Sequence, residues 1–215
     1  MSGVDAGDES ARVAVMGGTF DPIHHGHLFA AEEVAARLGL PRVIFMPCGQ
    51  PPHKTRDDLS PAADRYEMAV LATASNPRFE VSRLEMERDG PSYTIDTLRA
   101  LRRTLGPDTE VHFITGADAV LEIMTWKQPD AVLAECCMVA VHRPGYDLGR
   151  LAAVLGPERA ARIQPVAMHT LDISATDLRR RVHEGRSLRY LTPEPVIEYI
   201  ERRGLYGEGS VPAGG

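Results

Sequence analysis

The sequence predicts an α/β protein with a doubly wound parallel sheet and helices on both faces. Two observations lead to this fold class. Short apolar runs alternate with helix-like segments along most of the chain, as expected for parallel strands joined by crossover helices. The chain also has 215 residues, of which 43% are hydrophobic and 25% charged, enough for one globular domain with a substantial core.

The expected elements follow from hydrophobic periodicity and turn residues. Apolar runs predict strands over 12–16, 42–46, 79–82, 110–115, 137–142 and 162–166. Helical spacing predicts helices over 27–38, 61–74, 95–105, 117–134, 147–155, 175–184 and 194–203. The pattern leaves open a break near Thr125. We expect a single domain over residues 11–206, with flexible tails at 1–10 and 207–215.

Composition restricts the partners of the chain. A net charge of −6 argues against a surface for duplex nucleic acid, which requires a basic field. No run of 18 or more apolar residues could span a bilayer, and no charged-then-apolar leader opens the chain, so we expect no membrane partner. Cys48, Cys136 and Cys137 form no metal or disulfide framework, and reduced thiols suit a cytoplasmic protein.

The most informative segment, residues 17–28, lies between the first expected strand and the first expected helix. A glycine turn at this point leaves backbone N–H groups unpaired, and together with the helix dipole they favour a bound phosphate. Gly17 and Gly18 allow close approaches that a Cβ would prevent. His24 and His27, three apart across a glycine, add imidazole donors. The segment therefore predicts a nucleotide-phosphate site.

Two other interpretations of these histidines are open. His24, His25 and His27 could form a metal cluster with His53, although no Cys or carboxylate is spaced to complete one. They could also be residues of an ordinary turn. A glycine turn alone is weak evidence, whereas the turn, the histidines and the strand–helix context together favour phosphate binding.

The run Gly17-Gly18-Thr19-Phe20-Asp21-Pro22, followed by His24-x-Gly26-His27, resembles the signature of the nucleotidyltransferase superfamily. The resemblance implies a Rossmann-like nucleotidyltransferase fold in which the two histidines bind ATP phosphates during adenylyl transfer. The loop residues that it implies for ATP binding are Gly17, Gly18, Thr19, Phe20 and Gly26. Class I aminoacyl-tRNA synthetases share the histidine motif, but they are longer and carry a Lys-Met-Ser-Lys-Ser motif that is absent here.

A second candidate site spans Asp172–Arg179. Ser174 with Asp177 three residues later is close to a capping box, so the segment could simply be a well-capped helix. It also resembles the superfamily's Ile-Ser-Ser-Thr-x-Ile-Arg motif, with Ala175 and Leu178 in place of Ser and Ile. The resemblance implies contacts to the ATP phosphates from Ser174, Thr176 and Arg179.

The segment Pro51-Pro52-His53-Lys54 supplies a further candidate. The two prolines hold the chain extended and present Lys54, a point charge suited to a triphosphate. A lone loop lysine is more often simply solvated. Here the segment resembles a Pro-Pro-His-Lys/Arg segment of the superfamily, which implies that Lys54 acts on the phosphates.

The segment Gly90–Leu98 narrows the family. By itself it is a turn that runs into a helix, with Ser92 or Thr94 as cap. Its Pro-Ser-Tyr-Thr-x-Asp-Thr-Leu pattern resembles the bacterial nicotinate-nucleotide adenylyltransferases. That resemblance implies that Tyr93 and Thr94 bind the nicotinate mononucleotide, with backbone amides and Thr94 at its carboxylate.

Two more positions follow from the same resemblance. The Gly116-Ala-Asp118 segment implies ATP contacts, with Asp118 at the ribose hydroxyls. Trp126 is the only tryptophan, and a lone tryptophan is most often a packing residue. The resemblance implies that the Trp126 ring stacks on the pyridinium ring of the mononucleotide.

The resemblance as a whole implies transfer of AMP from ATP to nicotinate mononucleotide, giving nicotinate adenine dinucleotide and pyrophosphate in NAD biosynthesis. The implied catalytic residues are His24, His27, Lys54 and Arg179, with His27 at the α-phosphate. Mg²⁺ would accompany ATP and be held through phosphates and water, with no protein metal cage. The alternatives are a pantetheine-phosphate adenylyltransferase, which lacks the 91–98 pattern, and a catalytically inactive ATP-binding regulatory module. A homo-oligomer is compatible with the sequence.

Overall fold

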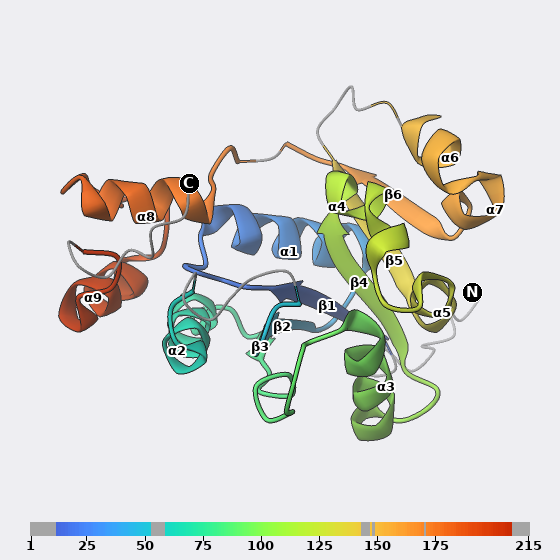
Figure 1. Ribbon diagram of the computed structural model, residues 1–215, viewed down its shortest axis with the longest axis horizontal. Coiled ribbons are helices and arrows are strands. Elements are labelled where there is room, and N and C mark those ends of the chain that lie inside the picture. Colours follow the sequence, from blue (N-terminus) through green and yellow to red (C-terminus); the bar gives the residue numbers. More distant parts are fainter. Residues whose placement is uncertain (1–11, 53–58, 143–146, 148, 170, 208–215) are drawn as a thin grey trace, which may run out of the picture.

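The computed structural model describes residues 12–52, 59–142, 147, 149–169 and 171–207. Within them, six parallel strands form one sheet in the order β3-β2-β1-β4-β5-β6 (Figure 1). The strands are β1 (Arg12–Gly18), β2 (Val43–Pro47), β3 (Phe79–Val81), β4 (Glu110–Gly116), β5 (Cys137–His142) and β6 (Ile163–Ala167). The predicted doubly wound parallel sheet is therefore confirmed.

The described helices are α1 (His25–Leu38), α2 (Ala62–Thr73), α3 (Thr94–Leu105), α4 (Ala117–Leu121), the 3-10 turn η3 (Ile123–Thr125), α5 (Pro129–Glu135), α6 (Gly149–Leu155), α7 (Pro157–Ala160), α8 (Ala175–His183) and α9 (Glu194–Arg203). The expected helix over 117–134 is divided into α4, η3 and α5, which confirms the break near Thr125. Within this break Gln128 adopts a left-handed φ of 54° immediately before Pro129, where α5 begins. The short α7, which was not predicted, begins at Pro157 after Gly156.

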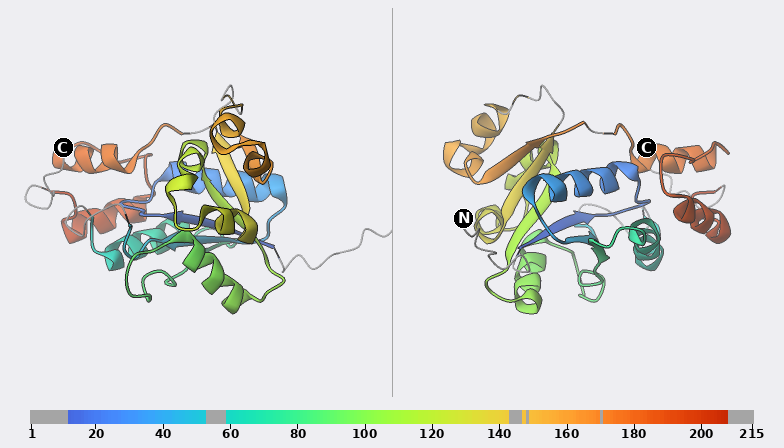
Figure 2. Two further views of the ribbon diagram at one scale, coloured as in Figure 1. Left: turned by 45° about the vertical axis from the view of Figure 1, so that its right-hand side comes forward. Right: turned by 180° about the vertical axis from the view of Figure 1, so that it is seen from behind.

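The sheet separates two apolar cores. Alternate residues of a strand point to opposite faces, so Ala14 and Met16 of β1 pack in one core and Val13 and Val15 in the other. Helices α1, α2, α8 and α9 supply the first core, and helices α3, α4, α5 and α6 supply the second. Figure 2 shows α1 and α3 on opposite sides of the sheet.

The strand order creates a switch point between β1 and β4. These strands are neighbours in the sheet although β2 and β3 lie between them in the sequence. In open α/β sheets, ligands bind beyond the carboxyl ends of the strands at such a point. The loops after β1, β2 and β4 leave the sheet at this edge and carry three of the selected segments, whereas the segments 90–98 and 172–179 follow β3 and β6.

Some sequence predictions fall outside the described residues. These include the tail at 1–10, nearly all of the tail at 207–215, and both His53 and Lys54. Among the helices that the structure does describe, none has the length and apolar character needed to cross a bilayer.

Candidate functional site

The segment between β1 and α1 forms a closely packed turn at the carboxyl end of the sheet. A Cβ added to Gly18 would lie 2.7 Å from the Phe20 ring, and one added to Gly17 would lie 3.1 Å from the Phe113 ring. Both glycines therefore let an aromatic side chain pack against the backbone. Phe20 as a whole is 2% exposed, and its ring packs against the backbone at Gly18 and edge-on against the His27 ring.

His24 and His27 lie together at the start of α1. Their rings stack with centroids 3.8 Å apart, and Gly26 leaves room for the His24 ring, because a Cβ there would lie 3.0 Å from it. The backbone N–H of His24 donates to Nδ1 of His27 over 3.3 Å. Since Nδ1 accepts this bond, neutral His27 carries its proton on Nε2. The Nε2–H group is thus the donor that His27 offers to a ligand.

His24 has an unsatisfied ring nitrogen. Its Nδ1 is buried and has no hydrogen-bond partner among the residues that the structure describes. Buried polar atoms in native proteins are nearly always paired, so such an atom indicates a ligand or a bound water. The His24 side chain also faces the backbone N–H of His27 in a capping-box arrangement, which favours the proton on Nε2 as the donor to a ligand.

Burial makes both histidines neutral at pH 7. Desolvation, followed by repulsion from His25, lowers the pKa of His24 to about 4. Desolvation, followed by repulsion from His24, lowers the pKa of His27 to about 3. An incoming phosphate therefore meets two neutral donors in this loop, with positive charge supplied by other residues.

These lowered pKa values predict that acid destabilises the fold. A histidine in the unfolded chain has a pKa of about 6.5, so below that pH the unfolded state binds protons that native His24 and His27 do not. We expect the free energy of unfolding to fall between pH 7 and pH 5 by on the order of 1–2 kcal/mol for each histidine. Urea unfolding at several pH values measures this fall.

The matched control is the double variant His24→Asn/His27→Asn, which removes both titrating groups. Its free energy of unfolding should depend less steeply on pH over the same range. A slope equal to that of the wild-type protein would show that the two native histidines titrate as they do in the unfolded chain.

Helix α8 brings the second predicted phosphate motif to the same place. Ser174 caps the helix, because its Oγ accepts from the Asp177 N–H over 3.1 Å. Nη1 of Arg179 donates to the backbone carbonyl of Asp21 over 2.8 Å, and Nη2 donates to Thr176 Oγ1 over 3.4 Å. The bond to Asp21 joins residues 158 positions apart. The start of α8 and the loop before α1 therefore meet in one site.

The buried side chain of Asp21 anchors the contact between α8 and the loop before α1. The residue is 2% exposed, and its Oδ1 accepts from the Tyr206 hydroxyl over 2.6 Å while its Oδ2 accepts from the Ser60 N–H over 3.2 Å. Burial, with repulsion from Asp21, raises the pKa of Tyr206, so its hydroxyl stays protonated as a donor. The sequence analysis named Asp21 only as part of the signature run and missed this anchoring role.

The residues predicted to bind nicotinate mononucleotide, Tyr93 and Thr94, lie at the start of α3. Tyr93 precedes this helix without a side-chain cap, so the first amide N–H groups, including that of Thr94, have no partner within the helix. Nζ of Lys127 lies 4.7 Å from the centroid of the Tyr93 ring and 2.9 Å from Oδ2 of Asp96. Unpaired amides at a helix N-terminus favour an anion, such as a carboxylate.

Trp126 and Asp118 both follow β4. Trp126 is half-buried and meets Phe113 edge-on, with ring centroids 6.4 Å apart. Phe113 also packs over Gly17, so it links the tryptophan to the phosphate loop. Gly116 precedes α4, and Asp118 lies exposed in the first turn of that helix. Both predicted ligand-binding positions are thus at the carboxyl end of the sheet.

Arg65 was missed altogether by the sequence analysis. It is 1% exposed and makes four hydrogen bonds to backbone carbonyls of the surrounding loops. A signal was present in the sequence, since Arg65 is in phase with Met68, Ala69 and Ala72 on the buried stripe of α2.

The described part of the chain offers no cluster of potential metal ligands near the phosphate loop. Among the described residues, no group of three or more His, Cys, Asp or Glu side chains is placed to hold a metal. Both carboxylate oxygens of Asp21 are engaged by protein donors.

The site lies within a region that matches known proteins. The model of the cytidylyltransferase-like family matches residues 15–181. A probable nicotinate-nucleotide adenylyltransferase of Moorella thermoacetica is 52% identical over 198 residues, which cover 91% of each chain. A second, from Acidothermus cellulolyticus, is 50% identical over 200 residues, 91% of this chain and 94% of its own.

A solved structure shows the same fold. Plasmodium falciparum nicotinic acid mononucleotide adenylyltransferase, complexed with NaAD, superposes with a TM-score of 0.76 and 18% identity, covering 91% of this chain and 97% of its own. At that identity the likeness is one of architecture.

Proposed function

Because the chain belongs to the cytidylyltransferase-like family, and within it to the nicotinate-nucleotide adenylyltransferases, we propose that its site transfers the adenylyl group of ATP to nicotinate mononucleotide. The products are nicotinate adenine dinucleotide and pyrophosphate. The observation that carries the proposal is the bond from Arg179 to the Asp21 carbonyl, which joins the two phosphate motifs beside the neutral pair His24 and His27.

The reaction is a single displacement at phosphorus. A phosphate oxygen of nicotinate mononucleotide attacks the α-phosphorus of ATP and forms a new P–O bond. The bond from the α-phosphorus to the bridging oxygen of the β-phosphate breaks, and pyrophosphate leaves with the electron pair. The attacking oxygen is already anionic, so no strong general base is needed. Catalysis then consists of positioning and charge stabilisation.

The protein donors divide this work between the phosphates. His27 donates from Nε2 to the α-phosphate, where charge shifts most during the reaction. His24, Lys54 and Arg179 hold the β- and γ-phosphates and the leaving pyrophosphate. Arg179 commits one N–H to Asp21 and one to Thr176, and its remaining N–H groups serve the phosphates. Mg²⁺ held through the ATP phosphates and water, with no protein cage, would supply further positive charge there.

The acceptor substrate, nicotinate mononucleotide, binds at the N-terminus of α3. The unpaired amides at the start of α3 bind the nicotinate carboxylate, together with Thr94, and Tyr93 lines this part of the site. Trp126 stacks on the pyridinium ring, whose positive charge favours an aromatic face. The amide form of the mononucleotide lacks the negative charge that α3 attracts, so we propose that the acid is the preferred substrate.

A pyrophosphate-release assay tests the proposed function. Purified protein receives ATP and Mg²⁺ with nicotinate mononucleotide, its amide or phosphopantetheine as acceptor. We expect release with nicotinate mononucleotide at a kcat/KM above that for either other compound. Release only with phosphopantetheine would identify a different adenylyltransferase, and no release with any acceptor would favour a regulatory ATP-binding module.

Trp126→Ala should act on the acceptor alone. Loss of a cation–π contact worth roughly 0.5–2 kcal/mol predicts a rise of about 2–30-fold in the KM for nicotinate mononucleotide, with the KM for ATP nearly unchanged. Steady-state kinetics with each substrate varied in turn measures both constants. Trp126→Phe, which keeps an aromatic face, is the control and should lose less. Equal increases in both KM values would indicate that Trp126 is a packing residue held by Phe113.

A further inference from the structure

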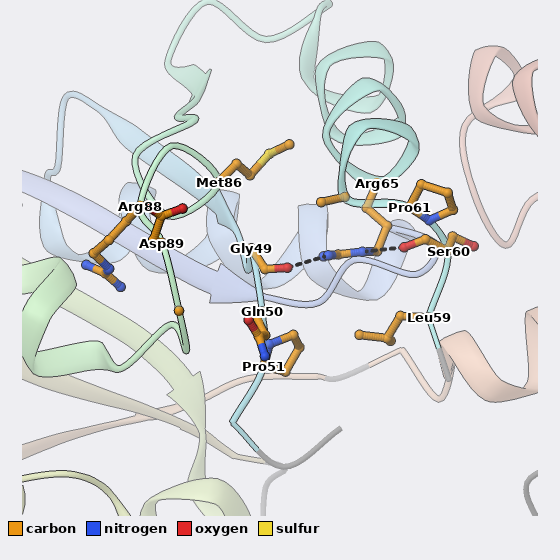
Figure 3. A pocket seen from close by; sticks show the side chains of 12 residues that line it. Gly49, Gln50, Pro51, Leu59, Ser60, Pro61, Arg65, Met86, Arg88 and Asp89 are labelled. Atoms are coloured by element: carbon orange, nitrogen blue, oxygen red, sulfur yellow. Dashed lines mark hydrogen bonds between the residues drawn. The ribbon is translucent and has the colours of Figure 1, made fainter. Parts of the chain in front are cut away.

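Arg65 is a buried cation whose described hydrogen bonds all go to backbone carbonyls. Figure 3 shows its guanidinium reaching from α2 between Gly49 and Ser60. Nε donates to the Ser60 carbonyl over 3.0 Å and Nη2 to that of Gly49 over 3.1 Å. Nη1 donates to the carbonyls of Thr19 and Cys48 over 2.8 and 2.6 Å. These bonds offset the cost of removing a guanidinium from water.

The carbonyls come from three separate segments. Thr19 belongs to the phosphate loop after β1, Cys48 and Gly49 follow β2, and Ser60 precedes α2. Arginine can hold such a set because its donors form a rigid planar fork. One side chain therefore fixes the loop after β1 against the loop after β2.

The direction of these carbonyls also sets the direction of the amides. In a trans peptide the C=O and N–H groups point in opposite directions. The carbonyls of Thr19 and Cys48 face Arg65, so the N–H groups of Phe20 and Gly49 face away from it. Neither N–H group has an acceptor among the residues described. Both are free to donate to a bound anion.

The peptide between Gly49 and Gln50 is oriented in the same way, and its N–H group already has an acceptor in the protein. The Gly49 carbonyl faces Arg65, and the N–H on the other side of that peptide, from Gln50, donates to Ser92 Oγ over 3.2 Å. The Ser92 N–H donates back to the Gln50 carbonyl over 2.8 Å. Ser92 lies two residues before Thr94. Arg65 is thus connected to the segment before α3 through the Gly49–Gln50 peptide and Ser92.

The loop after β2 has little freedom to adjust if this arrangement is lost. A Cβ added to Gly49 would lie 2.3 Å from the carbonyl oxygen of Glu85. The backbone of the loop after β2 is therefore in direct contact with the backbone of the loop after β3. Close backbone packing transmits a displacement of one loop to the other.

We propose that Arg65 is the positioning residue of the adenylyl-transfer site. It directs the Phe20 and Gly49 N–H groups toward the substrate phosphates and holds the start of α3 in register with the phosphate loop. The proposal rests on the proposed function, but Arg65 itself touches no substrate, because its donors are turned to the protein backbone.

Arg65→Lys is the decisive variant, because it keeps a cation but one ammonium cannot reproduce the fork. We expect kcat/KM to fall by about 10²-fold, the loss caused by a displacement of roughly 1 Å at a reacting group. The fall should combine a lower kcat with a higher KM for nicotinate mononucleotide. Arg102→Lys is the matched control: Nη2 of Arg102 also donates to a backbone carbonyl, that of Glu135, and this variant should keep its activity.

A measurement on the wild-type protein separates positioning from stability. On addition of a non-hydrolysable ATP analogue and nicotinate mononucleotide, the amide proton signals of Phe20 and Gly49 should move downfield in NMR spectra. The Gln50 signal should move less, because that N–H is already bonded to Ser92. In Arg65→Lys the Phe20 and Gly49 responses should shrink.

Wild-type kcat/KM in Arg65→Lys would overturn the proposal, and so would Phe20 and Gly49 signals that ignore the ligands. If Arg65→Lys fails to fold, the wild-type signals alone decide. Failure of the proposed function looks different, since the wild-type protein itself would then make no dinucleotide.

Discussion

His27→Ala is expected to lower kcat by about 10²–10³-fold while the fold survives, which is the usual effect of removing one transition-state donor. The lost group is the Nε2–H, because Nδ1 already accepts from the His24 backbone N–H. The KM for either substrate should change much less, since charge at the α-phosphate shifts mainly in the transition state. Steady-state kinetics with both substrates varied measures the two effects.

Amide replacements of His27 locate the active nitrogen. The Oδ1 of His27→Asn can still accept from the His24 N–H, but the side chain has no donor at the position of Nε2. His27→Gln extends an amide N–H toward that position. We expect the Asn variant to be as slow as the Ala variant and the Gln variant to be faster than both. Near-normal turnover in His27→Ala would remove His27 from the mechanism.

Arg179→Met should lower kcat/KM by about 10²-fold, because it removes a donor to the phosphates together with the bond to the Asp21 carbonyl. The kcat/KM of Arg179→Lys should lie between those of Arg179→Met and the wild-type protein, since lysine keeps the charge but lacks the guanidinium fork. Initial rates at low concentrations of ATP give kcat/KM directly.

Arg180 provides the control on the same helix. Its side chain is 62% exposed and pairs with Asp177, an arrangement that contributes little to stability. Arg180→Met should therefore keep kcat/KM within about twofold of the wild-type value. Equal losses from Arg180→Met and Arg179→Met would mean that the charge of α8 matters in general and that Arg179 has no special position.

The sheet could be predicted because its central strands are short apolar runs between turn residues. Val43–Pro47, for example, is buried along its whole length. Helix ends were less predictable, because contacts far along the chain help to set them. Helix α1 begins at His25, two residues before its expected start, and the His25 N–H donates to the carbonyl of Leu191 over 3.0 Å. No local spacing shows a contact of that kind.

Motifs in the sequence select His24, His27 and Arg179 as candidate site residues, and the structure brings their segments together. The contacts that join the motifs could not be predicted, since the bond from Arg179 to Asp21 spans 158 positions. Arg65 was overlooked because an arginine in a helix is usually at the surface, whereas here loop carbonyls satisfy its donors inside the protein. The choice of Nε2 as the His27 donor likewise required the bond from His24.

We propose that the adenylyl group passes from ATP to nicotinate mononucleotide in one displacement beside His24 and His27. The stereochemistry at the α-phosphorus is the sharpest test of this single displacement. The substrate is ATP with sulfur replacing one non-bridging α-oxygen in a known configuration, and nicotinate mononucleotide is the acceptor. A single in-line displacement predicts a dinucleotide with inverted configuration at that phosphorus. Retained configuration would require two displacements through a covalent adenylyl-protein, and it would contradict the assignment of His24, His27 and Arg179 as donors only.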